Sequence, residues 1–224
     1  MRGVGIVDTM RAGRMASVAS GGPWWDPDEA SLCVWGAWQA KGAASLAASY
    51  IDLSGNGNNL TPGVAPAWDA VNGWKFNGST HWLDTSFVFA ADRSQAGLAQ
   101  FTNRTNSGVI FGSYYSTTRG MLARPADGTG VRYSNCSQLV VAPQMGVAGN
   151  VGVSGSKGYR DGIADAGVMN VGTGDGFGRP VYLGALNWGG VNTPIAAYCQ
   201  AFVIYDCTLS AAQVLAVVTA MAAI

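Results

Sequence analysis

The sequence predicts an all-β fold, an antiparallel two-sheet sandwich with a short C-terminal helix. Glycine, which permits tight turns, supplies 32 of the 224 residues. Short apolar segments recur between turn signals at intervals of roughly 8–12 residues, which is typical of sandwiches and barrels. Charged residues make up only 12% of the chain, about half the usual share of roughly 25%. The Glu and Lys residues that normally cover helix surfaces are therefore scarce, which disfavours a helical architecture.

Most of the predicted strands are short and lie between Gly-rich or Asn-rich turns. They are, in chain order, Leu32 to Trp38, Gly73 to Gly78, Trp82 to Val88, Gly108 to Tyr115, Gly120 to Arg124, Gly130 to Ser134, Gln138 to Ala142, Val151 to Ser154, Val181 to Leu186 and Ala197 to Asp206. A hairpin is expected over residues 159–164, because Asp161-Gly162 is a strong signal for a type I′ turn.

The C-terminal segment predicts an amphipathic helix that begins after Ser210. Ser210 and Gln213 have the spacing of a capping box, in which each side chain bonds the other residue's backbone. The residues expected on the apolar face are Val214, Val217, Val218 and Met221. We expect this helix to pack against the sandwich that residues 31–224 form.

Residues 1–30 show no strand or helix period and are interpreted as an N-terminal arm that anchors the protein in an assembly. The aromatic pair Trp24-Trp25 would be costly to leave in water, so we expect it to fill a groove on a neighbouring subunit or on the sandwich flank. Arg2, Arg11 and Arg14 would pair with acidic groups of a partner. A loose tail is the alternative.

The charge balance excludes some classes of partner. The net charge is zero and the pI is near 6.5, so nucleic acid is not an expected partner. Few charges also resist self-association weakly, which favours a homo-oligomer or a larger assembly. The charge-free tail from Cys207 to Ile224 is too short for a membrane span. Asp8, Arg11 and Arg14 interrupt any apolar secretory signal.

The four cysteines are Cys33, Cys136, Cys199 and Cys207, and none of them forms a C-x-x-C pair. Without a secretory signal, reduced and buried thiols are the expectation. A disulfide is the alternative.

Six segments together resemble the laminin G-like domains of the concanavalin A-like lectin/glucanase superfamily. They are Asp52 to Leu60, Trp74 to Ser79, Trp82-Leu83, Tyr182 to Gly184, Ala201 to Asp206 and Leu209 to Val214. The charge-poor chain is most similar to copies in tailed-phage virion proteins. The resemblance implies a jelly-roll sandwich in a structural virion protein, either a capsid decoration protein or a tail or fibre component. Its partners would be other virion proteins, and it would be assembled into the virion in the host cytoplasm.

Catalysis is not expected. Glucanases of the superfamily use a Glu-x-Asp-x-x-Glu strand, whereas this chain has a single glutamate, Glu29, outside the predicted sandwich. A retaining glycosidase needs two carboxyl groups about 5 Å apart, and Asp161 and Asp165 flank a hairpin tip instead. The one histidine, His81, would not share a strand face with Asp84. We therefore predict a non-enzymatic protein and keep glycoside hydrolysis as a minor alternative.

Calcium is the metal that the resemblance implies, although no cofactor is required. Asp52, Asn56 and Asn58 offer oxygen ligands in one loop. The alternative is that their side chains stabilise the turn by hydrogen bonds to the backbone.

Sugar binding needs exposed aromatic rings beside planar hydrogen-bonding side chains. The residues that meet this description are Tyr114, Tyr115, Asn187, Trp188 and Asn192. Packing at the sandwich edge or at a subunit interface is the alternative role for the aromatic rings. A glycan-binding adhesion module that recognises cell-surface glycans is thus the second functional hypothesis, after the structural virion protein.

Overall fold

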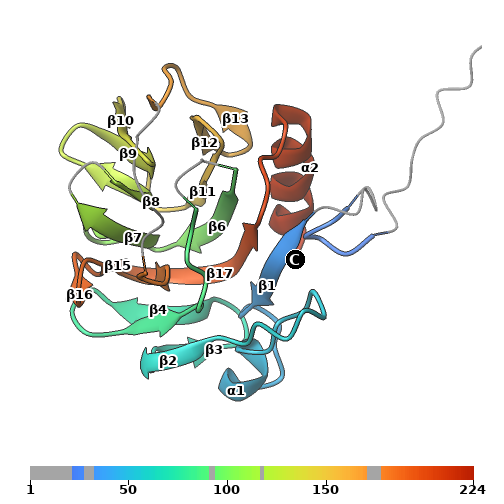
Figure 1. The fold of residues 1–224 in the computed structure, drawn as a ribbon. Helices are drawn as coiled ribbons and strands as arrows, with labels where there is room; N and C mark the ends of the chain where they lie inside the picture. The colour runs from blue at the N-terminus through green and yellow to red at the C-terminus, as the bar shows by residue number, and fades with distance from the viewer. Residues whose placement is uncertain (1–21, 28–32, 91–93, 117–118, 171–177) are drawn as a thin grey trace, which may run out of the picture.

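The computed structural model describes residues 22–27, 33–90, 94–116, 119–170 and 178–224. Over these residues the chain forms an eight-stranded sheet and a nine-stranded sheet that pack face to face (Figure 1). The longer of the two described helices, α2 (Ala211–Ala222), follows the last strand. The predicted two-sheet sandwich with a C-terminal helix is confirmed.

The eight-stranded sheet, called sheet A here, is built around the longest strand, β17 (Ala196–Tyr205). The first half of β17 pairs with β4 (Gly73–Asn77) and the second half with β1 (Val34–Gln39). On its other side β17 pairs with β6 (Ala96–Thr102). The outer strands of sheet A are β3 (Ala67–Asp69), β11 (Gly149–Ser154), β12 (Lys157–Arg160) and β13 (Ile163–Ala164).

The nine-stranded sheet, called sheet B here, has β7 (Phe111–Ser116) near its centre. From β7 the sheet continues through β8 (Arg119–Asp127), β9 (Gly130–Asn135) and β10 (Gln138–Val141). On the other side lie β14 (Tyr182–Leu183), β5 (Trp82–Asp84) and β2 (Thr61–Val64). β15 (Leu186–Asn187) pairs in parallel with β7 and forms a hairpin with β16 (Val191–Asn192). A four-residue helix, α1 (Leu46–Ser49), follows β1 in the chain.

The core lies between the two sheets and is rich in aromatic rings. Trp38 stacks on Phe202 with ring centroids 5.7 Å apart, and Phe202 also packs on Phe111 at 5.0 Å. Trp74 and Tyr133 are fully buried in the same cluster. Side chains alternate along each strand, so every second residue is left for the outer face of its sheet.

Two local predictions hold in detail. Asp161 and Gly162 have positive φ angles of 49° and 81°, as a type I′ turn requires, and they join β12 to β13. At the start of α2, Gln213 N donates to Ser210 Oγ and Ser210 N donates to Gln213 Oε1.

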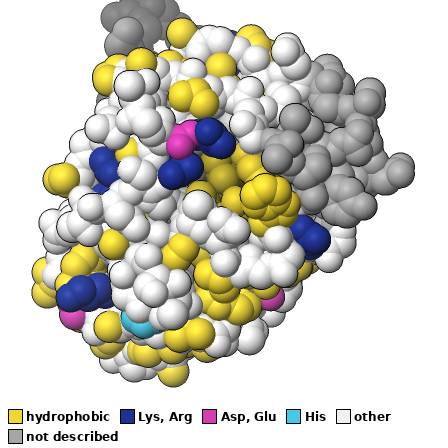
Figure 2. Space-filling model, turned by 90° about the vertical axis from the view of Figure 1, so that its left-hand side faces the viewer, with side chains coloured by type: hydrophobic (Ala, Val, Ile, Leu, Met, Phe, Trp, Pro, Cys, Tyr) yellow, Lys and Arg dark blue, Asp and Glu magenta, His cyan; other side chains and the backbone are white. Residues whose placement is uncertain are grey.

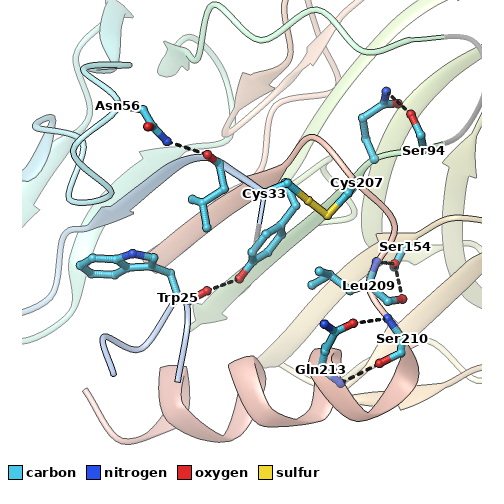
Figure 3. Close-up of a disulfide and its surroundings, with 12 residues drawn as sticks. Trp25, Cys33, Asn56, Ser94, Ser154, Cys207, Leu209, Ser210 and Gln213 are labelled. Atoms are coloured by element: carbon cyan, nitrogen blue, oxygen red, sulfur yellow. Dashed lines mark hydrogen bonds between the residues drawn. A yellow bond between two sulfur atoms is a disulfide. The ribbon is translucent and has the colours of Figure 1, made fainter. Parts of the chain in front are cut away.

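Helix α2 covers the outer face of sheet A. All four predicted apolar residues of α2 are buried there, in a cluster with Tyr205 and Trp24. Trp24 is only 8% exposed and contacts Trp25 edge-on, and the Tyr205 hydroxyl donates to the Trp25 carbonyl oxygen (Figure 3). Of the two placements predicted for the Trp pair, the structure thus shows the flank of its own sandwich. Arg2, Arg11 and Arg14 lie outside the described residues, and a role of the arm in assembly stays a prediction.

The expectation of reduced thiols is corrected by a disulfide between Cys33 and Cys207, with Cα atoms 5.9 Å apart (Figure 3). The two cysteines flank the β1–β17 ladder, and Asp206 N donates to the Cys33 carbonyl oxygen at 2.8 Å. The strand pairing therefore brings together two residues that are 174 positions apart. Cys136 and Cys199 are buried and outside the disulfide, as predicted.

Neither described helix combines the length and the apolar character that crossing a bilayer requires.

Candidate functional site

A cavity of about 400 Å³ opens on the outer face of sheet B, the face turned away from the core. It lies over β7, β8, β9 and the β15–β16 hairpin. Its lining residues are Val109, Tyr114, Leu122, Arg124, Arg132, Gln138, Leu186, Trp188, Asn192 and Thr193. Figure 2 looks onto this side of the molecule and shows an apolar hollow beside a group of basic side chains with an acidic one among them.

The floor of the cavity is apolar. Val109, Tyr114, Leu122 and Leu186 form a small cluster of buried side chains that is separate from the main core. Tyr114 and Leu122 reach this face because their strand neighbours alternate, sending residues such as Phe111 into the core. Burial raises the pKa of Tyr114. The Tyr114 phenol is therefore neutral at physiological pH.

Trp188 forms one wall of the cavity at the tip of the β15–β16 hairpin. The tip is tight because Gly189 and Gly190 both have positive φ, at 76° and 156°, and Gly190 O accepts a hydrogen bond from Trp188 N. This turn leaves the indole 45% exposed, unlike the aromatic rings of the core. Asn192 lies just beyond the turn and is also exposed. The hairpin thus presents an aromatic face and an amide side by side.

The opposite wall is basic. Arg124 on β8 and Arg132 on β9 are directly opposite each other in the strand register. Like charges in that position destabilise a sheet, and the carboxylate of Asp127 lies between them as a common partner. Asp127 Oδ1 is 2.8 Å from Arg124 Nη1, and Asp127 Oδ2 pairs with Arg132 Nη2. The Arg124 guanidinium also donates to the Ser107 carbonyl oxygen. Burial lowers the pKa of Arg124, while Asp127 acts in the opposite direction.

Of the five residues predicted to contact sugar, three line this cavity: Tyr114, Trp188 and Asn192. Asn187 is corrected, because its side chain is buried and donates to the Pro180 carbonyl oxygen at 2.9 Å. The side chain of Tyr115 lies outside the described part of the structure. Arg124, Arg132 and Gln138 were not predicted as site residues, although the alternation of the predicted strands could have placed both arginines on the outer face.

The loop proposed for calcium is closed by its own hydrogen bonds. Asp52 Oδ1 accepts from the backbone of Ala37 and Ser54, and Asp52 Oδ2 accepts from Asn58 N at 3.1 Å. The Asn56 and Asn58 amides donate to backbone carbonyl oxygens of β1. These contacts match the turn-stabilising alternative, and a calcium ion would have to displace the donors from Asp52.

His81, Asp161 and Asp165 have structural partners. His81 Nδ1 is 3.2 Å from the Lys75 carbonyl oxygen, at the start of β5. Asp161 Oδ1 accepts from Asn150 N at 2.7 Å, and Asp165 pairs with Arg160. Their contacts fit the predicted structural roles of the histidine and of the hairpin aspartates.

The fold and the cavity together define a jelly-roll sandwich domain with a cavity on an outer sheet face. No protein-family model and no curated protein sequence matches the chain. Solved structures do. Domain 4 of a GH43 extracellular arabinanase from Geobacillus stearothermophilus, in complex with arabinotriose, has a TM-score of 0.59 and 16% identity, over 83% of this chain and 98% of that one.

Two further matches come from longer proteins. Trypanosoma rangeli sialidase gives a TM-score of 0.57 at 18% identity, over 82% of this chain but 32% of the sialidase. The binding domain of botulinum neurotoxin serotype G gives a TM-score of 0.57 at 12% identity, over 82% of this chain and 50% of that one. At these identities the likeness shows the sandwich fold. A laminin G-like assignment within that fold is not shown.

The comparisons contradict the prediction of a non-enzymatic protein. The matched arabinanase domain is part of a glycoside hydrolase, and the matched sialidase is itself one. The prediction rested on the absence of a second glutamate, which excludes one arrangement of carboxylates and not carbohydrate chemistry as a whole.

The comparisons give no support to a phage origin, a structural role in a virion or a location in one. These expectations stay predictions from the resemblance. Glycan binding, the second functional hypothesis, agrees with the matched proteins, because they are carbohydrate-processing enzymes and a toxin binding domain.

Proposed function

We propose that the chain is a glycan-binding β-sandwich module that holds a sugar residue in the cavity on the outer face of sheet B. The observation that carries the proposal is the joining of a half-exposed indole, Trp188, to an apolar floor and to planar polar side chains in one cavity. A volume of about 400 Å³ lies within the range of roughly 300–1,000 Å³ for small-molecule sites.

The chemistry of the walls matches the two kinds of surface on a sugar ring. The C–H face of a pyranose or furanose is apolar and can lie on the flat, polarizable face of Trp188. The hydroxyl groups at the ring edge need both donors and acceptors, which the amides of Gln138 and Asn192 supply. The apolar floor keeps water away from these contacts and strengthens them.

The matched arabinanase domain supports the proposal, because it is solved in complex with arabinotriose and spans nearly the same sandwich. A shared sandwich does not by itself transfer a function. For that reason the proposal rests on the cavity residues of this chain and takes the comparisons as support.

The test is binding of the full chain to a panel of immobilised oligosaccharides, followed by titration of those it retains. Trp188→Ala should weaken binding by at least about tenfold, equal to about 1.4 kcal/mol. Because Trp188 is half exposed, the thermal midpoint should stay within about 2 °C of the parent, as is usual for surface changes below about 0.5 kcal/mol.

The matched control is Val71→Ala, which removes an exposed apolar side chain from the turn between β3 and β4 in the other sheet. This variant should bind like the parent. The proposal is wrong if no oligosaccharide binds, or if Trp188→Ala binds as tightly as Val71→Ala.

A further inference from the structure

The polar wall of the cavity carries a net positive charge. Two arginines and no carboxylate are among its lining residues. Asp127, which pairs with both arginines, neutralises one of the two positive charges. In the described part of the chain, Asp127 is the carboxylate that forms an ion pair with either arginine. One positive charge of the pair is therefore left without a carboxylate.

The two arginines also have hydrogen-bond donors that their ion pairs with Asp127 do not use. A guanidinium has five N–H donors. Arg132 pairs with Asp127 through Nη2, whereas its Nε is buried and has no hydrogen-bond partner. A buried donor without an acceptor costs free energy, and the Arg132 side chain is among those that line the cavity.

The strand register explains why the pair is poised for an anion. Arg124 and Arg132 are directly opposite each other on β8 and β9, and Asp127 at the end of β8 offsets only part of their repulsion. An anion bound between the guanidinium groups and the apolar floor would complete the neutralisation. Arginine suits this role because its planar fork matches both oxygens of a carboxylate.

We propose that the sugar held in this cavity carries a carboxylate, and that Arg132, supported by Arg124, binds it. This inference rests on the proposed function and names the ligand class of the same site. The carboxylate lies against the basic wall, while the ring lies on Trp188. The shared chemistry covers uronic acids and sialic acids, which the experiment distinguishes.

The experiment compares matched ligands that differ only in the carboxylate. One pair is a galacturonic acid trimer and its methyl ester, and the other is sialyllactose and the methyl ester of its sialic acid. At least one acidic ligand should bind about 10- to 100-fold more tightly than its neutral counterpart, which is the value of one or two charge-assisted hydrogen bonds. The preference should shrink as salt is added.

Two variants separate the arginine from the rest of the site. Arg132→Gln should abolish the preference, so that the acidic and the neutral member bind with equal affinity. The charge-matched control is Lys157→Gln, in the β11–β12 hairpin of sheet A, where Lys157 donates to the Gly167 carbonyl oxygen. This control should keep the full preference.

Asp127→Asn gives a test with the opposite sign. Without ligand, the two facing arginines lose their common counter-ion and the melting temperature should fall. Binding of the acidic ligand should become stronger, because an internal competitor for the guanidinium groups is gone. A purely structural role of the cluster would weaken binding in this variant instead.

The outcomes separate the two proposals. Equal affinity for both members of every pair overturns the inference and leaves the glycan-binding proposal standing. Preference for a sulfated oligosaccharide over both carboxylated ligands also overturns it. Absence of binding to any member of the panel overturns both proposals. A preference that Arg132→Gln retains would show that another group recognises the acid.

Discussion

Removal of the Cys33–Cys207 disulfide should lower the free energy of unfolding by about 3–5 kcal/mol, mainly through the unfolded chain. The bond closes a loop of 174 residues, for which loop-closure entropy gives about 5 kcal/mol at 25 °C. Measured effects of single disulfides are more often about 2–4 kcal/mol, so the lower part of the 3–5 kcal/mol range is also expected. In the native state the two ends stay in register without the bond, because Asp206 N still donates to the Cys33 carbonyl oxygen.

The assay is urea unfolding of the parent and of the double variant Cys33→Ser/Cys207→Ser, each with and without a reductant. For a domain of this size, 1 kcal/mol shifts the melting temperature by about 2–4 °C. In a parallel thermal melt, the melting temperature should therefore fall by roughly 6–20 °C when the bond is reduced or removed. Reductant should have no effect on the double variant, which is the internal control.

Thiol titration gives an independent count. The denatured, unreduced parent should show two reactive thiols, those of Cys136 and Cys199, and four after reduction. Four thiols before reduction would refute the disulfide itself. Two thiols together with a stability difference below about 1 kcal/mol would refute the reasoning from loop entropy.

Three further predictions concern single side chains. Trp24→Ala should cost about 3 kcal/mol in urea unfolding, because the indole is buried under α2, and a parent-like melt would contradict its docking on its own sandwich. Ser210→Ala should cost about 1 kcal/mol by removing the capping box, whereas Ser210→Asp should retain most of the stability. Burial raises the pKa of Asp84, so its contribution to stability is present below the unfolded-state pKa and is lost as pH rises through the folded-state pKa. Asp84→Asn should flatten that slope in the pH range above the ordinary aspartate pKa of about 3.9, and an unchanged slope would exclude Asp84 as its source.

The features that local sequence decides were predictable. The turn at Asp161-Gly162 and the cap at Ser210 depend on residues that are neighbours in the chain, and both form as expected. β6, over Ala96–Thr102, was missed although it is central to sheet A. Its sequence, AGLAQFT, has little of the β-branched and aromatic character that is typical of strands. Its strand conformation is stabilised by pairing with β11 and β17.

The site was predictable only in part, for the same reason. Trp188 could be found because an aromatic residue before two glycines indicates an exposed turn. Arg124 and Arg132 gain their meaning from the register that sets them face to face across β8 and β9. Asn187 was misplaced because its strand partner β7, which buries it, is far away in the sequence.

The placement of α2 has a consequence for how the domain can be displayed. Residues 22–27 and the C-terminal Ile224 lie near α2 on the outer face of sheet A, and the Ile224 carbonyl oxygen accepts a hydrogen bond from Lys41 Nζ (Figure 1). The cavity is on the outer face of sheet B, with both sheets and the core between. A bead or sensor surface coupled at Ile224 therefore stands behind every copy, and all cavities face the solution. In such an array, copies spaced to match neighbouring sugars on one polymer would bind together, and avidity could exceed single-site affinity by about 10²–10⁴ without any new contact.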